Sequence, residues 1–190
     1  MYAIIACGVF KDELERISKD LGFSFEAHYL GAGLHVDFDK LRRAMVAELE
    51  KCKDYEGIIV LYGECHPKIR EILAPYKAAL MDCQNCVDAF ITRKGMEERA
   101  SRGLFFYLSP GWTKAWREIF GALGWSQGEA RLQLGAFKGA FFLDTMGNAH
   151  DFEQDLLEFF DYTLLSIEVV PVDLDHFKSL ILRAKKELEG

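Results

Sequence analysis

Cysteine and histidine are the residues of this 190-residue chain whose types and positions could do chemistry. Cys7 and Cys65 come at or shortly after the ends of apolar runs typical of buried strands, and Cys86 follows a further run of this kind. Three thiolates and an imidazole supply the soft sulfur and borderline nitrogen ligands that zinc or an iron–sulfur cluster prefers. We therefore predict a metal site of the Cys3His type, with the choice between a zinc ion and an iron–sulfur cluster left open.

Two members of this ligand set have competitors in the sequence. Cys83 precedes Cys86 by three residues and competes with it for the place of the third thiolate. The imidazole is either His35, which follows a glycine turn, or His66, which adjoins Cys65. The alternative to a metal site is a set of scattered cysteines that only pack in the core.

Cys83 and Cys86 also form a Cys-x-x-Cys pair that could exchange disulfides. We expect a helix to run from this pair through Phe90, in which case the helix dipole would lower the pKa of a thiol at its start. Asp82 opposes this effect, because its negative charge disfavours a neighbouring thiolate. A dithiol oxidoreductase is therefore the second hypothesis for function.

The elements that must position these residues can be placed from the apolar pattern. The clearest strand runs from Ile58 to Tyr62, because it is short, rich in β-branched and aromatic residues, and bounded by Gly57 and Gly63. Residues 125–137 are the least readable part of the chain. Further strands are expected at 2–6, 23–30, 76–81, 104–108, 139–143 and 163–170, and helices at 10–21, 41–52, 69–73, 83–90, 110–123, 152–160 and 174–188.

Strands that alternate with helices at this spacing indicate parallel βαβ units with right-handed crossovers. We therefore predict the α/β class, as a three-layer αβα sandwich with a mostly parallel, doubly wound sheet, in a single domain over residues 1–190. The carboxyl ends of the strands would then collect at one rim, where open α/β sheets bind ligands. Trp112 is expected either in the core or as one wall of the site.

Composition narrows the classes of partner. The net charge of −7, with acidic residues scattered along the chain, argues against nucleic acid as a partner, because such a partner requires a basic stripe. No apolar run approaches the roughly 20 residues that span a bilayer, so no membrane segment is expected. Five cysteines, an odd number, suit a reducing cytoplasm better than a disulfide framework. Gly31-Ala32-Gly33 is only a fragment of a dinucleotide fingerprint, so no nucleotide cofactor is predicted.

Five short motifs along the first three fifths of the chain carry a family resemblance. They are Ala6-Cys7-Gly8, Leu34-His35, Tyr62-Gly63-Glu64-Cys65, Asn85-Cys86 and Tyr107-Leu108-Ser109-Pro110-Gly111-Trp112. In this order they resemble the archaeal and bacterial family called domain of unknown function 1638. The resemblance favours Cys86 over Cys83 as the third thiolate and His35 over His66 as the imidazole.

The resemblance also implies a setting for the predicted site. Members of this family look to be associated with corrinoid-dependent methyl transfer in anaerobes, which implies a corrinoid protein or a methyltransferase as partner. If the chain is an enzyme, the reaction expected is metal-assisted transfer or removal of a small group in C1, corrinoid or sulfur metabolism. The third hypothesis is a non-catalytic accessory protein of a methyltransferase system. No catalytic residue and no small-molecule substrate are assigned.

Overall fold

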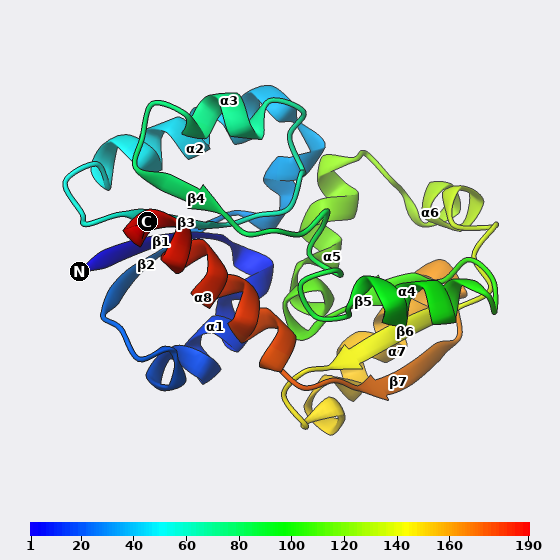
Figure 1. Cartoon of the computed structure of the whole chain (residues 1–190). Helices are drawn as coiled ribbons and strands as arrows, with labels where there is room; N and C mark the ends of the chain where they lie inside the picture. The colour runs from blue at the N-terminus through cyan, green and yellow to red at the C-terminus, as the bar shows by residue number, and fades with distance from the viewer.

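The strands divide between two sheets, which the computed structural model places side by side (Figure 1). The structure describes the whole chain of 190 residues except for the side chain of Arg93. Every strand pairing among the described residues is parallel, so the predicted α/β class and parallel pairing are confirmed. The strands form two sheets, of four and three strands, where the sequence suggested one.

The first sheet has the strand order β2-β1-β3-β4. Its strands are β1 (Tyr2–Cys7), β2 (Phe25–Leu30), β3 (Ile58–Leu61) and β4 (Ala78–Leu80). The side chains of β1 from Ala3 onward and all those of β3 are buried. This burial on both faces explains their continuous apolar sequence, because helices cover both sides of the sheet.

The helices around the first sheet complete the three layers of the predicted αβα sandwich. One face carries α2 (Phe38–Lys51) and α3 (Ile69–Leu73), and the other carries α1 (Lys11–Ile17) and α8 (Asp175–Glu189) (Figure 1). α8 follows the second sheet in sequence, yet it returns to pack against β3 and β4 of the first. The last helix therefore ties the two sheets together.

The second sheet has the strand order β5-β6-β7. Its strands and the helices connected to them are β5 (Phe106–Leu108), β6 (Ala140–Asp144), β7 (Ile167–Pro171), α5 (Pro110–Ala122), α6 (Gln127–Gln133) and α7 (Glu153–Thr163). α5 contacts β5, β6 and α7. It also contacts two short 3-10 helices that follow strands of the first sheet, Gly8–Phe10 after β1 and Ala32–Val36 after β2. α5 thus lies between the two sheets, where it can bring side chains of both to one place.

The order in which strands are added to the first sheet reverses between β1 and β3, although all of its strands are parallel. β1 is followed by a crossover to β2 on one side, and the chain then returns past β1 to β3 and moves outward to β4. Ligands of open α/β sheets bind outside the carboxyl ends of the strands at such a reversal. The reversal lies beside Cys7, the last residue of β1, and beside the loop that contains Cys65.

One predicted helix is absent from the structure, and two helices that were not predicted are present. Residues 83–90 form turns where a helix was expected. The Asn85 side chain accepts hydrogen bonds from the backbone N–H groups of Val87 and Asp88, as the first residue of a helix does, but the chain makes only one turn, which the N–H of Ile91 closes on the carbonyl of Val87. α4 (Arg93–Ala100), which was not expected, follows after an N-cap at Thr92. The unreadable stretch 125–137 contains α6, which begins with a capping box formed by Ser126 and Glu129.

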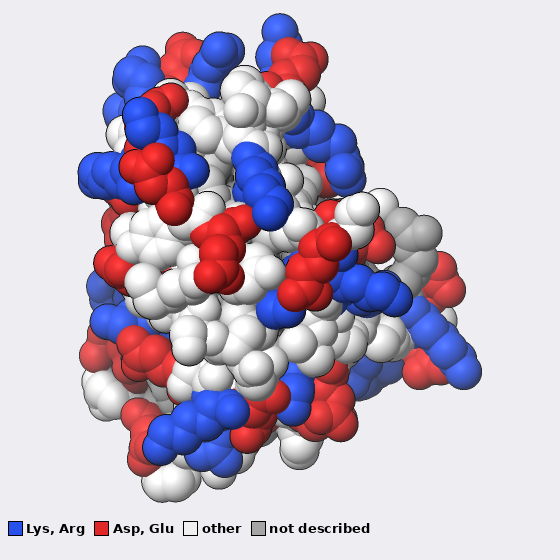
Figure 2. Space-filling view, turned by 60° about the vertical axis from the view of Figure 1, so that its left-hand side comes forward, with Lys and Arg blue, Asp and Glu red and all other residues white. Residues whose placement is uncertain are grey.

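Charges of both signs are mixed on the molecular surface. Figure 2 shows one face on which Lys and Arg side chains are interspersed with Asp and Glu, unlike the basic stripe that a nucleic-acid backbone requires. Within the described part of the chain, every helix is too short or too polar to cross a membrane.

Glu13 on α1 is a buried acid that links the two sheets. Its side chain is fully buried, and its Oε1 accepts a hydrogen bond of 2.8 Å from the hydroxyl of Thr145, which directly follows β6. Its second oxygen has no hydrogen-bond partner among the described atoms. Burial raises the pKa of the Glu13 carboxyl to about 7, although the Thr145 hydrogen bond lowers it in part.

We expect the Glu13→Gln variant to be stabilised relative to the wild type as the pH rises. The native state holds the Glu13 proton more tightly than the unfolded chain, so the wild type loses stability between about pH 4.5 and pH 7. A Gln side chain does not ionise, so the difference in unfolding free energy should grow by about 2 to 3 kcal/mol in its favour from pH 5 to pH 8. Urea unfolding at both pH values measures this difference, with Glu15→Gln, an exposed acid of the same helix, as the matched control. An equal gain for both variants would contradict the assignment.

Candidate metal centre

The four leading candidates for the metal site line one cavity. The cavity has a volume of about 450 Å³ and lies at the carboxyl ends of β1 and β3, between the two sheets. Cys7, Cys65, Cys86 and His35 all contribute to its lining, although they come from four separate segments of the chain. The structure therefore brings these residues to one place, while their binding of a metal stays a prediction.

Each of these side chains is positioned by the end of a strand. Cys7 is the last residue of β1 and lies just before the 3-10 helix Gly8–Phe10. Cys65 lies in the loop that follows β3, and Cys86 lies in the turns that follow β4. His35 lies within the 3-10 helix that follows β2. Because all four strands are parallel, their carboxyl ends point to the same edge of the sheet.

Gly63 allows the loops of Cys65 and Cys86 to touch. A Cβ atom at this position would lie 2.5 Å from the carbonyl oxygen of Gln84 and 2.6 Å from the backbone of Asn85. Next to it, the N–H of Glu64 donates a hydrogen bond of 2.9 Å to the same carbonyl of Gln84. Only glycine leaves room for this approach, so the two cysteine loops are held against each other through backbone atoms.

Gly111 allows a similar close approach of two backbone segments next to Cys7. A Cβ atom here would overlap the carbonyl oxygen of Val9, so the first turn of α5 packs directly on the backbone that follows Cys7. Ser109 caps this turn, since its hydroxyl accepts the backbone N–H of Trp112. The close packing brings Trp112 to the edge of the cavity.

Trp112 donates a hydrogen bond to one of the candidate ligands. Its indole Nε1 lies 3.1 Å from the Sγ of Cys86, and its ring lies 6.1 Å from the ring of His35. A donor at this position favours the thiolate form of Cys86 and would affect the reduction potential of a redox metal bound to that sulfur. Of the two roles that the sequence left open for Trp112, a wall of the site matches its place in the structure.

The candidate thiols are all held in the protonated form at neutral pH. Burial raises the pKa of Cys7 to about 11 and that of Cys86 to about 12, and it raises the pKa of Cys65 as well. The thiols also act on one another: Cys65 raises the pKa of both Cys7 and Cys86, as like charges do at short range. A bound cation would offset the free-energy cost of forming these buried thiolates, because its positive charge stabilises anions that would otherwise repel one another.

Tyr62 lies beside these thiols with its hydroxyl buried. The hydroxyl makes no hydrogen bond of ordinary geometry with the described atoms, but it is close enough to Cys7 to lower the pKa of that thiol. Burial strongly raises the pKa of Tyr62 itself, and Cys7 and Cys65 raise it further. Tyr62 is therefore a neutral donor that can turn toward a thiolate.

The structure distinguishes the two candidate histidines. The Nδ1 of His35 donates to the carbonyl of Ala32 at 2.6 Å, which leaves Nε2 as the nitrogen free to accept a metal. His66 does not line the cavity: its Nδ1 accepts the backbone N–H of Lys68 at 3.0 Å, and its ring packs edge-on against Phe38. His35 therefore has the position suited to a ligand and His66 has a structural one.

The remaining cysteines do not contribute to the cavity lining. Cys83 is half-buried, and its thiol points to the carbonyl of Tyr62 at 3.9 Å. Cys52 is fully buried just after the end of α2. Among the described side chains, no group of three or more Cys, His, Asp or Glu stands close enough together to surround a single metal ion. The cavity-lining thiols would therefore have to converge to hold one ion.

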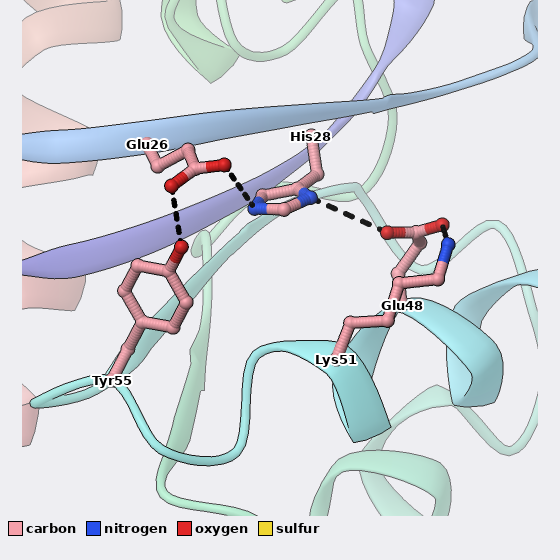
Figure 3. Close-up of polar contacts among 5 residues, drawn as sticks. All are labelled: Glu26, His28, Glu48, Lys51 and Tyr55. Carbon is pink, nitrogen blue, oxygen red and sulfur yellow. Dashed lines mark hydrogen bonds and ion pairs between the residues drawn. The ribbon is translucent and has the colours of Figure 1, made fainter.

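His28 belongs to a polar network on β2, away from the cavity (Figure 3). Its Nδ1 lies 3.3 Å from a carboxylate oxygen of Glu48, while its Nε2 lies 3.7 Å from Glu26, too far for a hydrogen bond. Tyr55 donates to Glu26 at 2.5 Å, and Lys51 donates to Glu48 at 2.6 Å. The network ties β2 to α2 and to the turn before β3.

Trp112→Phe should change the properties of a centre bound at Cys86. Phe keeps the aromatic wall but removes the N–H donor to the sulfur, so the thiolate becomes more electron-rich and the reduction potential of a bound redox centre should become more negative. Trp116→Phe is the matched control, because Trp116 lies on the same helix and its indole N–H has no partner among the described atoms. Spectroelectrochemical titration measures both potentials, and equal shifts would contradict the role assigned to Trp112.

The fold and the cavity define an α/β protein with thiols gathered at the strand reversal of a parallel sheet. The family described as "Protein of unknown function (DUF1638)" matches residues 29–181. This match covers most of the chain, so the chain belongs to that family and the resemblance carried by its motifs is confirmed. Cys65, Cys86 and His35 lie inside the matched segment, and Cys7 precedes it. No curated protein and no solved structure matches the chain significantly.

Proposed function

We propose that Cys7, Cys65 and Cys86 hold a metal centre that faces the cavity, with His35 as a fourth ligand or a nearby base. The observation that carries this proposal is that three thiols from three separate strand ends line one cavity together with an imidazole. Sulfur and imidazole nitrogen suit zinc and iron–sulfur clusters. The hydrogen bond from Trp112 to Cys86 supports it further, because metal-bound thiolates commonly accept such bonds.

An iron–sulfur cluster fits this arrangement better than a single zinc ion. Tetrahedral zinc with Zn–S bonds of about 2.3 Å holds its sulfur ligands about 3.8 Å apart. The described thiols influence one another's pKa, yet they do not stand as a group around one ion. A cluster is larger than an ion and takes cysteine ligands that are spread more widely. Three ligands on separate segments that line one cavity match that requirement.

The arrangement would leave one metal position facing the cavity. A centre with three thiolate ligands and one open position would supply Lewis-acid activation of a small molecule. His35 lies on the same lining and could move a proton at that position through its Nε2. Metal-assisted transfer or removal of a small group is therefore the reaction class that we propose.

Anaerobic reconstitution of metal-free protein tests this proposal. One sample receives iron and sulfide and another receives zinc, and each is desalted before the metal content and the visible spectrum are measured. We expect the iron and sulfide sample to retain both elements and to show a broad sulfur-to-iron absorption band. Retention of zinc alone would leave a metal site but contradict the cluster, and retention of neither would contradict the proposal.

The alternative of a dithiol oxidoreductase makes a different prediction for Cys83 and Cys86. No helix begins at this pair, so a helix dipole is not available to stabilise a thiolate. Burial raises the pKa of both thiols, and Asp88 raises that of Cys83 further. A catalytic dithiol requires one thiol whose pKa is lowered toward neutrality.

In metal-free native protein, we expect Cys83 and Cys86 to be alkylated slowly at pH 7.5. Their low thiolate fraction should make iodoacetamide react at least about a hundredfold more slowly than with the same residues in urea-unfolded protein. Mass spectrometry of peptides after timed quenching gives both rates. Fast reaction of either thiol in the native protein would favour the oxidoreductase.

A further inference from the structure

The wall that faces the thiols comes from the second sheet and its flanking segments, and it is apolar. Leu104, Phe106, Tyr107 and Phe137 line this side of the cavity, and Met96 of α4 adds to it. No Asp, Glu, Lys or Arg is among the described side chains that line the cavity. Burying an unpaired charge in such surroundings is costly, so the cavity disfavours charged ligands.

The apolar wall is preformed by aromatic packing. The ring of Phe106 packs edge-on against Trp112 at a centroid distance of 5.6 Å and against Phe137 at 5.8 Å. On its other side it stacks on Phe159, a fully buried residue of α7. These contacts fix the rings before any ligand binds, which favours binding of a flat or compact apolar molecule.

Most polar groups at the cavity already have partners within the protein. The side-chain oxygen of Asn85 accepts two backbone N–H groups, and the Nδ1 of His35 bonds to Ala32. The Tyr62 hydroxyl, the Nε2 of His35 and the thiols therefore remain for a ligand on the side of the first sheet, and the Tyr107 hydroxyl is a polar group on the opposite wall. A ligand would meet polar atoms and the proposed metal at one end and mostly hydrocarbon along the rest of its length.

From this division we infer that the cavity binds an uncharged, largely apolar organic molecule with one polar or ligating end directed at the thiols. This inference names the substrate class of the proposed metal centre and rests on that proposal for the chemistry at the polar end. The volume of about 450 Å³ lies within the range of small-molecule sites, about 300 to 1,000 Å³. A compound of the size of two or three aromatic rings would fill it.

Two fluorescent probes that differ in charge test the inference on the full-length, metal-free protein. N-phenyl-1-naphthylamine is uncharged, and 1-anilinonaphthalene-8-sulfonate is nearly the same molecule with an added sulfonate. We expect the uncharged probe to bind with enhanced fluorescence, at least about tenfold more tightly than the anionic probe, which corresponds to 1.4 kcal/mol. Equal binding of the two probes, or no binding of the uncharged one, would overturn the inference.

Two matched variants locate the bound probe. Leu104 lies at the mouth of the cavity with 53% of its surface exposed, so Leu104→Asp should weaken binding of the uncharged probe about tenfold and leave the fold intact. Leu157, which is 60% exposed on α7, belongs to a separate apolar surface with Phe160 and Val169. Leu157→Asp should leave binding unchanged. Loss of binding in Leu157→Asp but not in Leu104→Asp would place the probe on that surface and overturn the inference.

The result is distinguishable from a failure of the metal proposal. Retained probe selectivity in a protein that binds no metal would remove the metal centre and keep the apolar ligand site. Stoichiometric metal in a protein that fails the probe test would keep the metal centre and remove the apolar ligand site.

Discussion

Replacement of any one of Cys7, Cys65 and Cys86 by alanine should abolish stoichiometric metal binding, whereas Cys52→Ala should leave it unchanged. Loss of a hydrogen bond to a ligand costs about 10- to 100-fold in metal affinity, so loss of a ligand itself should cost at least about 100-fold. The three residues line the cavity, and Cys52 lies buried beyond the end of α2. Metal analysis of the four variants after anaerobic reconstitution measures the effect.

The control variant separates ligation from packing. Cys52 is fully buried, so its replacement removes a core sulfur and tests whether the loss of buried volume alone reduces metal content. Thermal unfolding of each variant shows that it is folded under the conditions of the metal analysis. Equal metal content in all four folded variants would show that the cavity thiols are not ligands.

Gly111→Ala should both destabilise the protein and weaken the proposed site. Its new Cβ atom would overlap the carbonyl oxygen of Val9, and neither backbone can give way without moving α5 off the loop that follows Cys7. Overpacking of this kind should lower the free energy of unfolding by about 2 to 4 kcal/mol. The movement would also displace Trp112 from Cys86, so metal affinity should fall with stability. Urea unfolding and metal titration measure the two effects.

Gly121→Ala on the same helix is the matched control for this prediction. Apart from its chain neighbours and the nearby backbone of its own helix, no described atom lies within 4 Å of a Cβ built at Gly121, and the residue is exposed. Alanine there should stabilise the helix by about 0.5 to 1 kcal/mol, because glycine loses more backbone entropy on folding. If Gly111→Ala proved as stable as Gly121→Ala, the close packing of α5 on Val9 would be disproved.

The strands could be predicted from the sequence because their burial is local in origin. Ile58 to Leu61 and Ala3 to Cys7 are apolar without interruption, and such runs become strands buried on both faces. All seven expected strands are present, with ends that shift by a few residues. The division into two sheets could not be predicted, because pairing between strands depends on contacts distant in sequence.

The errors among the helices concern segments whose start or absence the apolar pattern does not report. After Asn85 the chain makes only one turn where a helix was expected, and Ser126 with Glu129 starts a helix in a stretch with no readable stripe. The motif of serine followed three residues later by glutamate could have revealed α6. α4 is polar along its length and carries no fully buried residue among those described, so its pattern gave no signal.

That Cys7, Cys65, Cys86 and His35 would lie at one edge followed from a topological argument, that parallel strands end at the same edge. The preference for Cys86 over Cys83 and for His35 over His66 came from the family resemblance. The facing wall of Phe106 and Phe137 was not foreseen, since Phe106 lies on a strand of the second sheet and Phe137 precedes another, and both have the pattern of ordinary core. The role of Gly111 was hidden as well, because only the packing of α5 on Val9 requires a glycine there. The association with corrinoid-dependent methyl transfer stays a prediction, because the description of the family names no function.

The most direct test of the central claim is a count of iron, zinc and acid-labile sulfide per chain in protein purified without oxygen, together with its visible spectrum. The account predicts iron and sulfide in comparable stoichiometric amounts and a broad absorption band from sulfur-to-iron charge transfer. A folded protein that holds none of these elements, and takes up none when they are supplied, would contradict the claim that the three cavity thiols hold a metal centre.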